Sequence, residues 1–155
     1  MPKLVKGGKY VFGWVAVGEN GEISIPPEAA DEYGLTEPRD LIAIEGSQAG
    51  GGFGVSRLDK LADSPLGVIL ERYAELESGS GEEPVLVEGR SKIYARVSLN
   101  GEGRLLFTPE ILEAFGIRPG DKILALRGSN LALSYAVRGP IVEEAARHPE
   151  LKVFP

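Results

Sequence analysis

The sequence contains no cysteine, one histidine, one methionine and one tryptophan among its 155 residues. The absence of cysteine excludes disulfides, thiol catalysis and thiolate metal sites, and it fits a reducing compartment. The only histidine, His148, precedes a proline near the end of the chain and has no catalytic or ligand partner at a motif spacing. We therefore expect no enzyme, no metal and no cofactor. We expect His148 to be a surface residue at the end of the last helix.

Long apolar runs are also absent. None approaches the roughly 20 residues that a membrane-spanning helix requires. The first residues, 1–9, carry charge but lack the apolar core of a secretory signal. We therefore expect a cytoplasmic protein with no membrane partner. A chain of this length buries roughly 70% of its unfolded surface, so it needs no covalent staple to fold.

The sequence does contain an internal duplication of one module. Residues 21–47 match residues 103–129 at an offset of 82, with no gap. Such self-similarity at a fixed period indicates an internal repeat. We call residues 11–57 the first copy and residues 92–138 the second copy. The identical pairs are Gly21 with Gly103, Pro27 with Pro109, Glu28 with Glu110, Gly34 with Gly116, Ala43 with Ala125, Gly46 with Gly128 and Ser47 with Ser129.

Each half is predicted to contain two strands, a short helix, two strands, a helix and a short strand. In the first copy Pro26-Pro27 ends a strand and opens a helix, which Gly34 ends. A second helix is predicted at 65–77, a linker at 78–84, a strand at 85–87 and a last strand at 151–154. The apolar face of the second helix would contain Leu66, Ile69, Leu70, Tyr73 and Leu76. We expect residues 1–90 and 91–155 to form two units that share one core.

A glycine-rich loop follows the strand at Leu41–Ile44. It is not a phosphate-binding loop, because it lacks the Gly-Lys-Ser/Thr ending and leads into a strand rather than a helix. The second copy has Asn130-Leu-Ala at this place, so the module does not require glycine there. The pattern predicts a flexible hairpin loop and leaves the role of residues 50–54 open.

The two copies differ strongly in charge. Residues 11–57 contain eight acidic and two basic residues, a net charge of −6, whereas residues 92–138 contain seven basic and four acidic residues, a net of +3. One interpretation is solubility and attraction between the copies. The other is that only the second copy meets an anionic partner.

The stretches from Gly103 to Glu110 and from Gly116 to Lys122 resemble the AbrB/SpoVT-type swapped-hairpin modules. This family includes AbrB-like regulators, MazE-type antitoxins and the MraZ proteins, which have two modules per chain. The resemblance implies a mainly β (α+β) fold, in which tandem modules exchange hairpins within one chain. The result would be a pseudo-dimeric β-barrel with short helices. It also implies DNA binding through basic residues on strands and loops, and homo-oligomers.

Three functional hypotheses follow. The first is an AbrB/SpoVT-like regulator that binds double-stranded DNA. The second is a protein-interaction or oligomerising module of the same fold, antitoxin-like or a scaffold, that does not bind DNA. The acidic first copy favours the second hypothesis, because Glu22 stands where the second copy has Arg104. The third is a small-ligand-binding barrel, favoured only by the glycine-rich loop.

Five residues are the candidates for nucleic-acid contact. Arg104 follows the glycine of the family motif. Residues alternate faces along a strand, so a strand through residues 92–97 would present a row on one face. Such a row can follow a phosphate backbone. The alternative for Arg104 is an ion pair with Glu22 or Glu28 of the first copy. The five candidates are Lys92, Tyr94, Arg96, Arg104 and Arg127.

Matched apolar positions predict a shared core and an approximate two-fold relation between the copies. Eight residues would meet there: Ile23, Ile25, Leu35, Ile44, Leu105, Phe107, Ile117 and Leu126.

Overall fold

A computed structural model describes residues 10–73, 76, 85–89, 92–129 and 131–155. The predicted linker at 78–84 lies outside the described residues. The elements of the first half are β1 (Val11–Ala16), β2 (Glu22–Ser24), α1 (Pro27–Tyr33), β3 (Arg39–Glu45), β4 (Phe53–Arg57), α2 (Leu58–Ala62), the 3-10 helix η1 (Pro65–Gly67), α3 (Val68–Arg72) and β5 (Val85–Glu88). Those of the second half are β6 (Ile93–Leu99), β7 (Arg104–Leu106), α4 (Pro109–Ala114), β8 (Lys122–Arg127), β9 (Leu133–Ala136), α5 (Pro140–Ala145) and β10 (Val153–Phe154).

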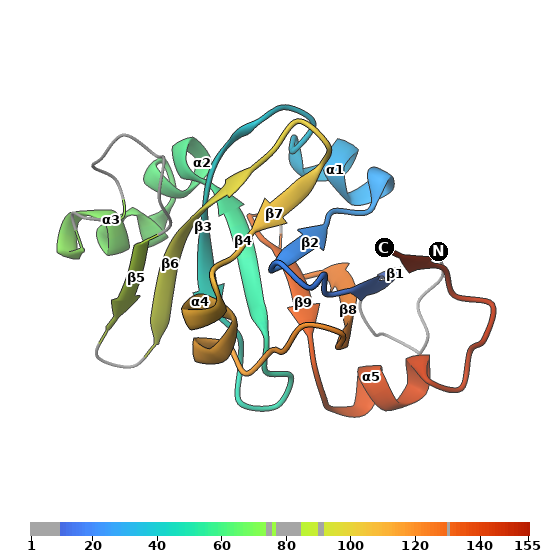
Figure 1. The fold of residues 1–155 in the computed structure, drawn as a ribbon. Coiled ribbons are helices and arrows are strands. Elements are labelled where there is room, and N and C mark those ends of the chain that lie inside the picture. Colours follow the sequence, from blue (N-terminus) through green and yellow to red (C-terminus); the bar gives the residue numbers. More distant parts are fainter. Residues whose placement is uncertain (1–9, 74–75, 77–84, 90–91, 130) are drawn as a thin grey trace.

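The strands form one mixed sheet that curls into a nearly closed, barrel-like shape (Figure 1). Its order is β10-β1-β8-β9-β4-β3-β6-β7-β2, with β5 also paired to β6. Among the strands of the described residues, only β1 and β10 pair in parallel. At the open edge the Gly18 amide, just after β1, donates to the Glu22 carbonyl of β2 at 2.9 Å. The prediction of a mainly β fold with short helices is confirmed.

Strands 82 residues apart occupy equivalent positions in this sheet. β3 pairs with β6, and β8 pairs with β1. The registers correspond as well, because Leu41 lies opposite Val97 in one pair and Ile123 opposite Val15 in the other. β2 and β7, which are themselves 82 residues apart, pair directly with each other.

The main core lies inside the curled sheet and draws on both halves. Six of the eight predicted core residues belong to it: Ile23, Ile25, Leu35, Leu105, Phe107 and Ile117. The prediction was wrong for Ile44 and Leu126, which lie on the outer face. The reason is the two-residue alternation of a strand: Ala43 and Ala125 point inward, so the next residues must point outward.

Helices cover two regions of the outer face, at opposite ends of the molecule in Figure 1. One small cluster includes Trp14 and Leu124 and is covered by α5, which contributes Ala145. The other surrounds Ile42 and is covered by α2 and α3, which contribute Leu61 and Leu70. These helices therefore close the apolar outer surface that the sheet alone would leave exposed.

The predicted helix at 65–77 was wrong in its extent and in one residue of its apolar face, Leu66, whereas Ile69, Leu70, Tyr73 and Leu76 all belong to the cluster around Ile42. The chain forms η1 and then α3, which ends at Arg72, and Leu66 is 46% exposed. Ser64 accepts from the Leu66 amide, and Gly67 stands between the two short helices. A serine cap, a proline and a glycine favour a short 3-10 turn over one continuous helix. Residues 74–75 and 77 lie outside the described chain.

No helix in the described ranges is both long enough and apolar enough to span a membrane.

Candidate functional site

Arg96 lies on β6 opposite Ile42, and it is buried. Its Nη2 forms an ion pair with an Oδ atom of Asp40 at 2.5 Å, and the Ser98 hydroxyl donates to the other oxygen of that carboxylate at 3.2 Å. Only 8% of the Arg96 side chain is exposed. This first candidate for nucleic-acid contact therefore joins the two halves inside the protein.

Tyr94 and Lys92 share the face of β6 with Arg96, as predicted. The ring of Tyr94 packs on Tyr73, just after α3, with 5.4 Å between ring centroids. Burial raises the pKa of Tyr94. Lys92, just before β6, donates from Nζ to the backbone carbonyl of Glu45 at 3.0 Å. The row therefore runs from an exposed lysine to a buried arginine and does not lie open along its length.

Arg104 lies on β7, in the pair that joins β2 and β7. Its Nη1 is 3.5 Å from a carboxylate oxygen of Glu22, and about a third of each side chain is exposed. Both residues stand at the same position of their copies. The predicted alternative of an ion pair with Glu22 is therefore confirmed.

Arg127, at the end of β8, forms two hydrogen bonds with the Glu32 carboxylate, at 2.6 and 2.5 Å. Its guanidinium lies 4.7 Å from the centre of the Tyr10 ring, and the Tyr10 hydroxyl donates to Glu28 at 2.5 Å. The hydrogen bonds from Arg127 lower the pKa of Glu32, and the hydrogen bond to Glu28 raises the pKa of Tyr10. We call Tyr10, Glu28, Glu32, Tyr33 and Arg127 the Arg127 corner.

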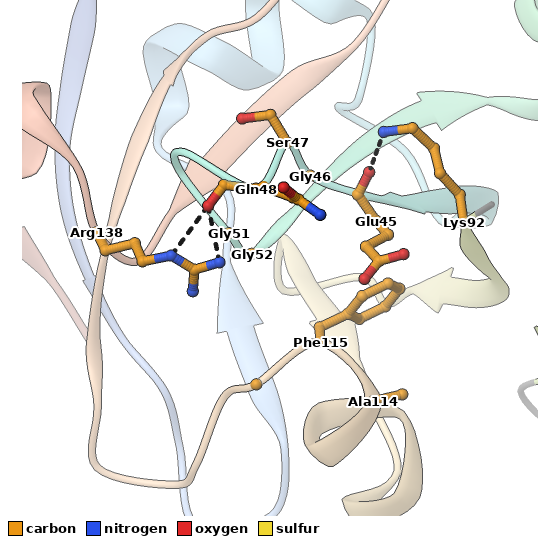
Figure 2. Close-up of a pocket in the computed structure, with 11 residues that line it drawn as sticks. Glu45, Gly46, Ser47, Gln48, Gly51, Gly52, Lys92, Ala114, Phe115 and Arg138 are labelled. Carbon is orange, nitrogen blue, oxygen red and sulfur yellow. Dashed lines mark hydrogen bonds between the residues drawn. The ribbon is translucent and has the colours of Figure 1, made fainter.

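The equivalent place in the other half is open. The residues at the equivalent positions of the other copy, 82 positions away in the sequence, are Lys92, Glu110, Ala114, Phe115 and Glu45. Four of these line a pocket of about 360 Å³, together with the glycine-rich loop and Arg138 (Figure 2). We call this the Lys92 pocket. Where Glu32 lies in the Arg127 corner, the pocket has only the methyl group of Ala114.

Hydrogen bonds hold the glycine-rich loop in one shape. Gly46 donates to the Gly52 carbonyl, and Gly51 donates to the Ser47 carbonyl. Gly51 and Gly52 have φ values of 66° and 65°, in the left-handed region that favours glycine. A Cβ atom on Gly52 would lie 2.0 Å from the Tyr135 carbonyl oxygen. The two glycines are therefore required by the turn and by its close approach to β9.

Arg138 is a pocket residue that the sequence did not single out. Its Nε and Nη2 donate to the Gln48 carbonyl at 3.1 and 2.9 Å, and Figure 2 shows it on the side of the pocket opposite Lys92. The available sequence clue was loop length. Residues 46–52 form this loop, whereas only residues 128–132 form its counterpart. The longer loop reaches across to Arg138.

His148 lies just beyond α5, on the surface, between two acids. Its Nε2 is 2.9 Å from Glu144 and its Nδ1 is 3.2 Å from Glu150. The hydrogen bond to Glu144 is the main cause that raises the pKa of His148. Within the described ranges, no group of three or more histidine, cysteine, aspartate or glutamate residues could hold a metal ion.

Comparisons of the chain with models of protein families, with curated proteins and with solved structures found no match.

Proposed function

We propose that this chain is an internally duplicated swapped-hairpin module of the AbrB/SpoVT type, working as a protein-interaction and oligomerising unit that makes no DNA contact of its own. The fold part of the proposal is supported by the strand pairs β3–β6 and β8–β1, which are equivalent at an offset of 82. It is supported as well by the core, to which both halves contribute.

One observation carries the functional part. Three of the four basic candidates for phosphate contact have a carboxylate partner in the first copy, and the fourth, Lys92, donates to a backbone carbonyl there. Arg96 pairs with Asp40, Arg104 with Glu22 and Arg127 with Glu32. The opposite charges of the two copies therefore form ion pairs with each other. These ion pairs need no external anion.

Phosphate binding through these residues would first have to break these pairs. For Arg96 the cost is high, because its side chain is only 8% exposed and a phosphate would have to displace the half-buried Asp40 carboxylate to reach it. The turns beside β2 and β7 also contain exposed acids, Glu19 and Glu102. Their charge opposes a phosphate backbone approaching that surface, since affinity for DNA depends on net neutralisation of phosphates.

A DNA-binding regulator is the second candidate, and Arg104 is the observation in its favour. Its ion pair with Glu22 is long, at 3.5 Å, and partly exposed. Exposed ion pairs contribute only about 0–1 kcal/mol, so a phosphate could replace Glu22 at little cost. Arg104 also matches the arginine that follows the glycine in the motif of the family that this chain resembles.

The decisive experiment measures binding to random duplex DNA by fluorescence anisotropy at low and moderate salt. The variants are Arg104→Ala, Glu22→Gln and, as a control with the same charge change, Glu19→Gln. Under the proposal the parent shows no saturable binding, and no variant differs from it. A DNA regulator would instead bind with a negative salt slope. Arg104→Ala would reduce that slope by about one unit, and Glu22→Gln would bind more tightly than Glu19→Gln.

The oligomerising part of the proposal is tested separately, by light scattering on the purified chain. We expect the mass of an oligomer, which is at least twice the 16.5 kDa of one chain. A monomer across the accessible concentration range would contradict self-association, whatever the result with DNA.

A further inference from the structure

We propose that the Lys92 pocket binds a small organic anion, a carboxylate or a phosphate monoester, that also carries a hydrogen-bond donor. This inference goes beyond the proposed function and concerns a different part of the surface. The volume of about 360 Å³ falls at the lower end of the range for small-molecule sites.

The two cations of the pocket differ from the other basic residues between the copies. Lys92 donates to the Glu45 carbonyl, and Arg138 donates to the Gln48 carbonyl. These acceptors are neutral, and among the described residues neither cation has a carboxylate within ion-pair distance. Arg96, Arg104 and Arg127 each have one. Two cations without a carboxylate within ion-pair distance therefore line one pocket, which contains a single carboxylate, that of Glu45.

Hydrogen-bond donors remain available around the cavity. The Lys92 ammonium has three N–H bonds, of which one is directed at Glu45. Arg138 donates from Nε and Nη2 to the Gln48 carbonyl. Its third nitrogen, Nη1, lies beside Gly51, 2.7 Å from the position that a Cβ atom on Gly51 would occupy. The Ser47 Oγ accepts from the Gly50 amide, so its own hydrogen can be donated. An oxyanion is the ligand group that accepts from several such donors at once.

Glu45 explains why the ligand needs a donor as well. One oxygen of its carboxylate accepts from the Ile93 amide at 3.0 Å. Figure 2 shows the carboxylate beside the Phe115 ring, between Lys92 and Arg138. A simple anion placed here would meet an acceptor that it cannot satisfy. A hydroxyl or amino group on the ligand would donate to Glu45, and the ring would form an apolar wall.

In the Arg127 corner, side chains fill the space that is open at the Lys92 pocket. Arg127, Glu32 and Tyr10 fill that space with an ion pair and a cation–π contact. Introducing the counterpart of Glu32 as Ala114→Glu would place a carboxylate in the pocket. This change is the internal control that the duplication offers, since a glutamate is already accommodated at the equivalent helix position.

The test is an amide chemical-shift titration of the full chain at constant ionic strength. The probes are glycerol 3-phosphate, sulfate and chloride. We expect saturable shifts at Gly46, Gly51 and Gly52 with glycerol 3-phosphate. Lys92→Gln should weaken binding by roughly tenfold or more, as expected for losing a charged hydrogen bond. Ala114→Glu should abolish binding, and Arg147→Gln, on the exposed surface outside the pocket, should leave it unchanged.

The proposal is overturned if glycerol 3-phosphate causes no saturable shift, or if Lys92→Gln binds like the parent. Equal affinity for sulfate, which carries no hydrogen-bond donor at neutral pH, would overturn the requirement for a donor. If Ala114→Glu does not fold, as judged from its amide spectrum, the comparison of Lys92→Gln with Arg147→Gln still decides the matter.

Discussion

The Arg127 corner and the Lys92 pocket occupy equivalent positions on the two halves of one sheet, yet they differ in almost every side chain. Of the five equivalent positions, only one has the same residue in both copies, the glutamate at Glu28 and Glu110. In the first, a bidentate ion pair and an aromatic ring fill the space. In the second, a lysine, an alanine and a longer loop leave a cavity. The backbone pattern thus tolerates opposite chemistries on its surface.

The interior of the molecule has diverged much less. Counterparts such as Ile23 and Leu105, or Leu35 and Ile117, are all buried in the main core. The reason is physical, because close packing penalises changes of volume or polarity inside, whereas surface substitutions away from special contacts usually cost little. The comparison therefore separates what the fold requires from what each half can vary.

The largest effect is expected from the shared core. Phe107 is 3% exposed, and its ring lies 4.9 Å from that of Phe53 in the other half. Phe107→Ala should reduce the free energy of unfolding by about 3–5 kcal/mol. Its counterpart Ile25→Ala should cost about 2–5 kcal/mol, because both residues lie in one core.

Urea denaturation measures both variants. Leu106→Ala is the control, since this neighbour is 36% exposed and should change stability by less than Phe107→Ala. If only one of the two core variants lost stability, the halves would not share their core in the way described.

A smaller effect should distinguish the equivalent glycines of the two hairpin turns. Gly21 and Gly103 have φ values of 81° and 76°, so alanine is strained by about 1–2 kcal/mol at either position. At Gly21, however, a Cβ would also lie 2.1 Å from the Phe107 carbonyl oxygen, whereas at Gly103 nothing lies within 4 Å. Gly21→Ala should therefore destabilise the protein more than Gly103→Ala. Thermal unfolding of both variants checks this order, and equal losses would show that the Phe107 strand moves aside.

The smallest effect concerns the pH dependence of the Arg127 corner. The folded pKa of Glu32 lies below its ordinary value of 4.5, mainly because of the hydrogen bonds from Arg127. The stabilisation is therefore present above the unfolded pKa and is lost as pH falls through the folded pKa. Since both side chains are partly exposed, we expect this contribution to be small.

Glu32→Gln should remove this acid-dependent loss, so its stability should change less than that of the parent below about pH 4.5. Denaturation midpoints between pH 3 and pH 6 measure the difference. Glu110→Gln provides the matched control, because this exposed carboxylate lies in the other half, where no arginine occupies the equivalent of Arg127. Parallel curves for Glu32→Gln and the parent would show that the ion pair contributes nothing.

The sequence by itself determined most of the elements and their order, apart from the helices between Leu58 and Arg72. Local signals sufficed, because proline and glycine bound the short helices and alternation marks the strands, as at Glu22–Ser24 and Arg104–Leu106. It could also have shown that Ile44 faces outward, had the alternation been followed from Ala43. Where a helix was broken by Ser64, Pro65 and Gly67, the apolar periodicity of 65–77 was misleading, since periodicity ignores such local breaks.

Only the tertiary structure decided what each basic residue contacts. Arg96 and Asp40, or Arg127 and Glu32, are far apart in the chain and meet because the sheet curls and brings the two halves together. The same holds for the Lys92 pocket, which needs the loop of the first copy, the helix end of the second copy and Arg138 in one place. Sequence determines which charges exist, because composition is local. Their neutralisation depends on distances of a few ångströms between distant segments, and these arise only on folding.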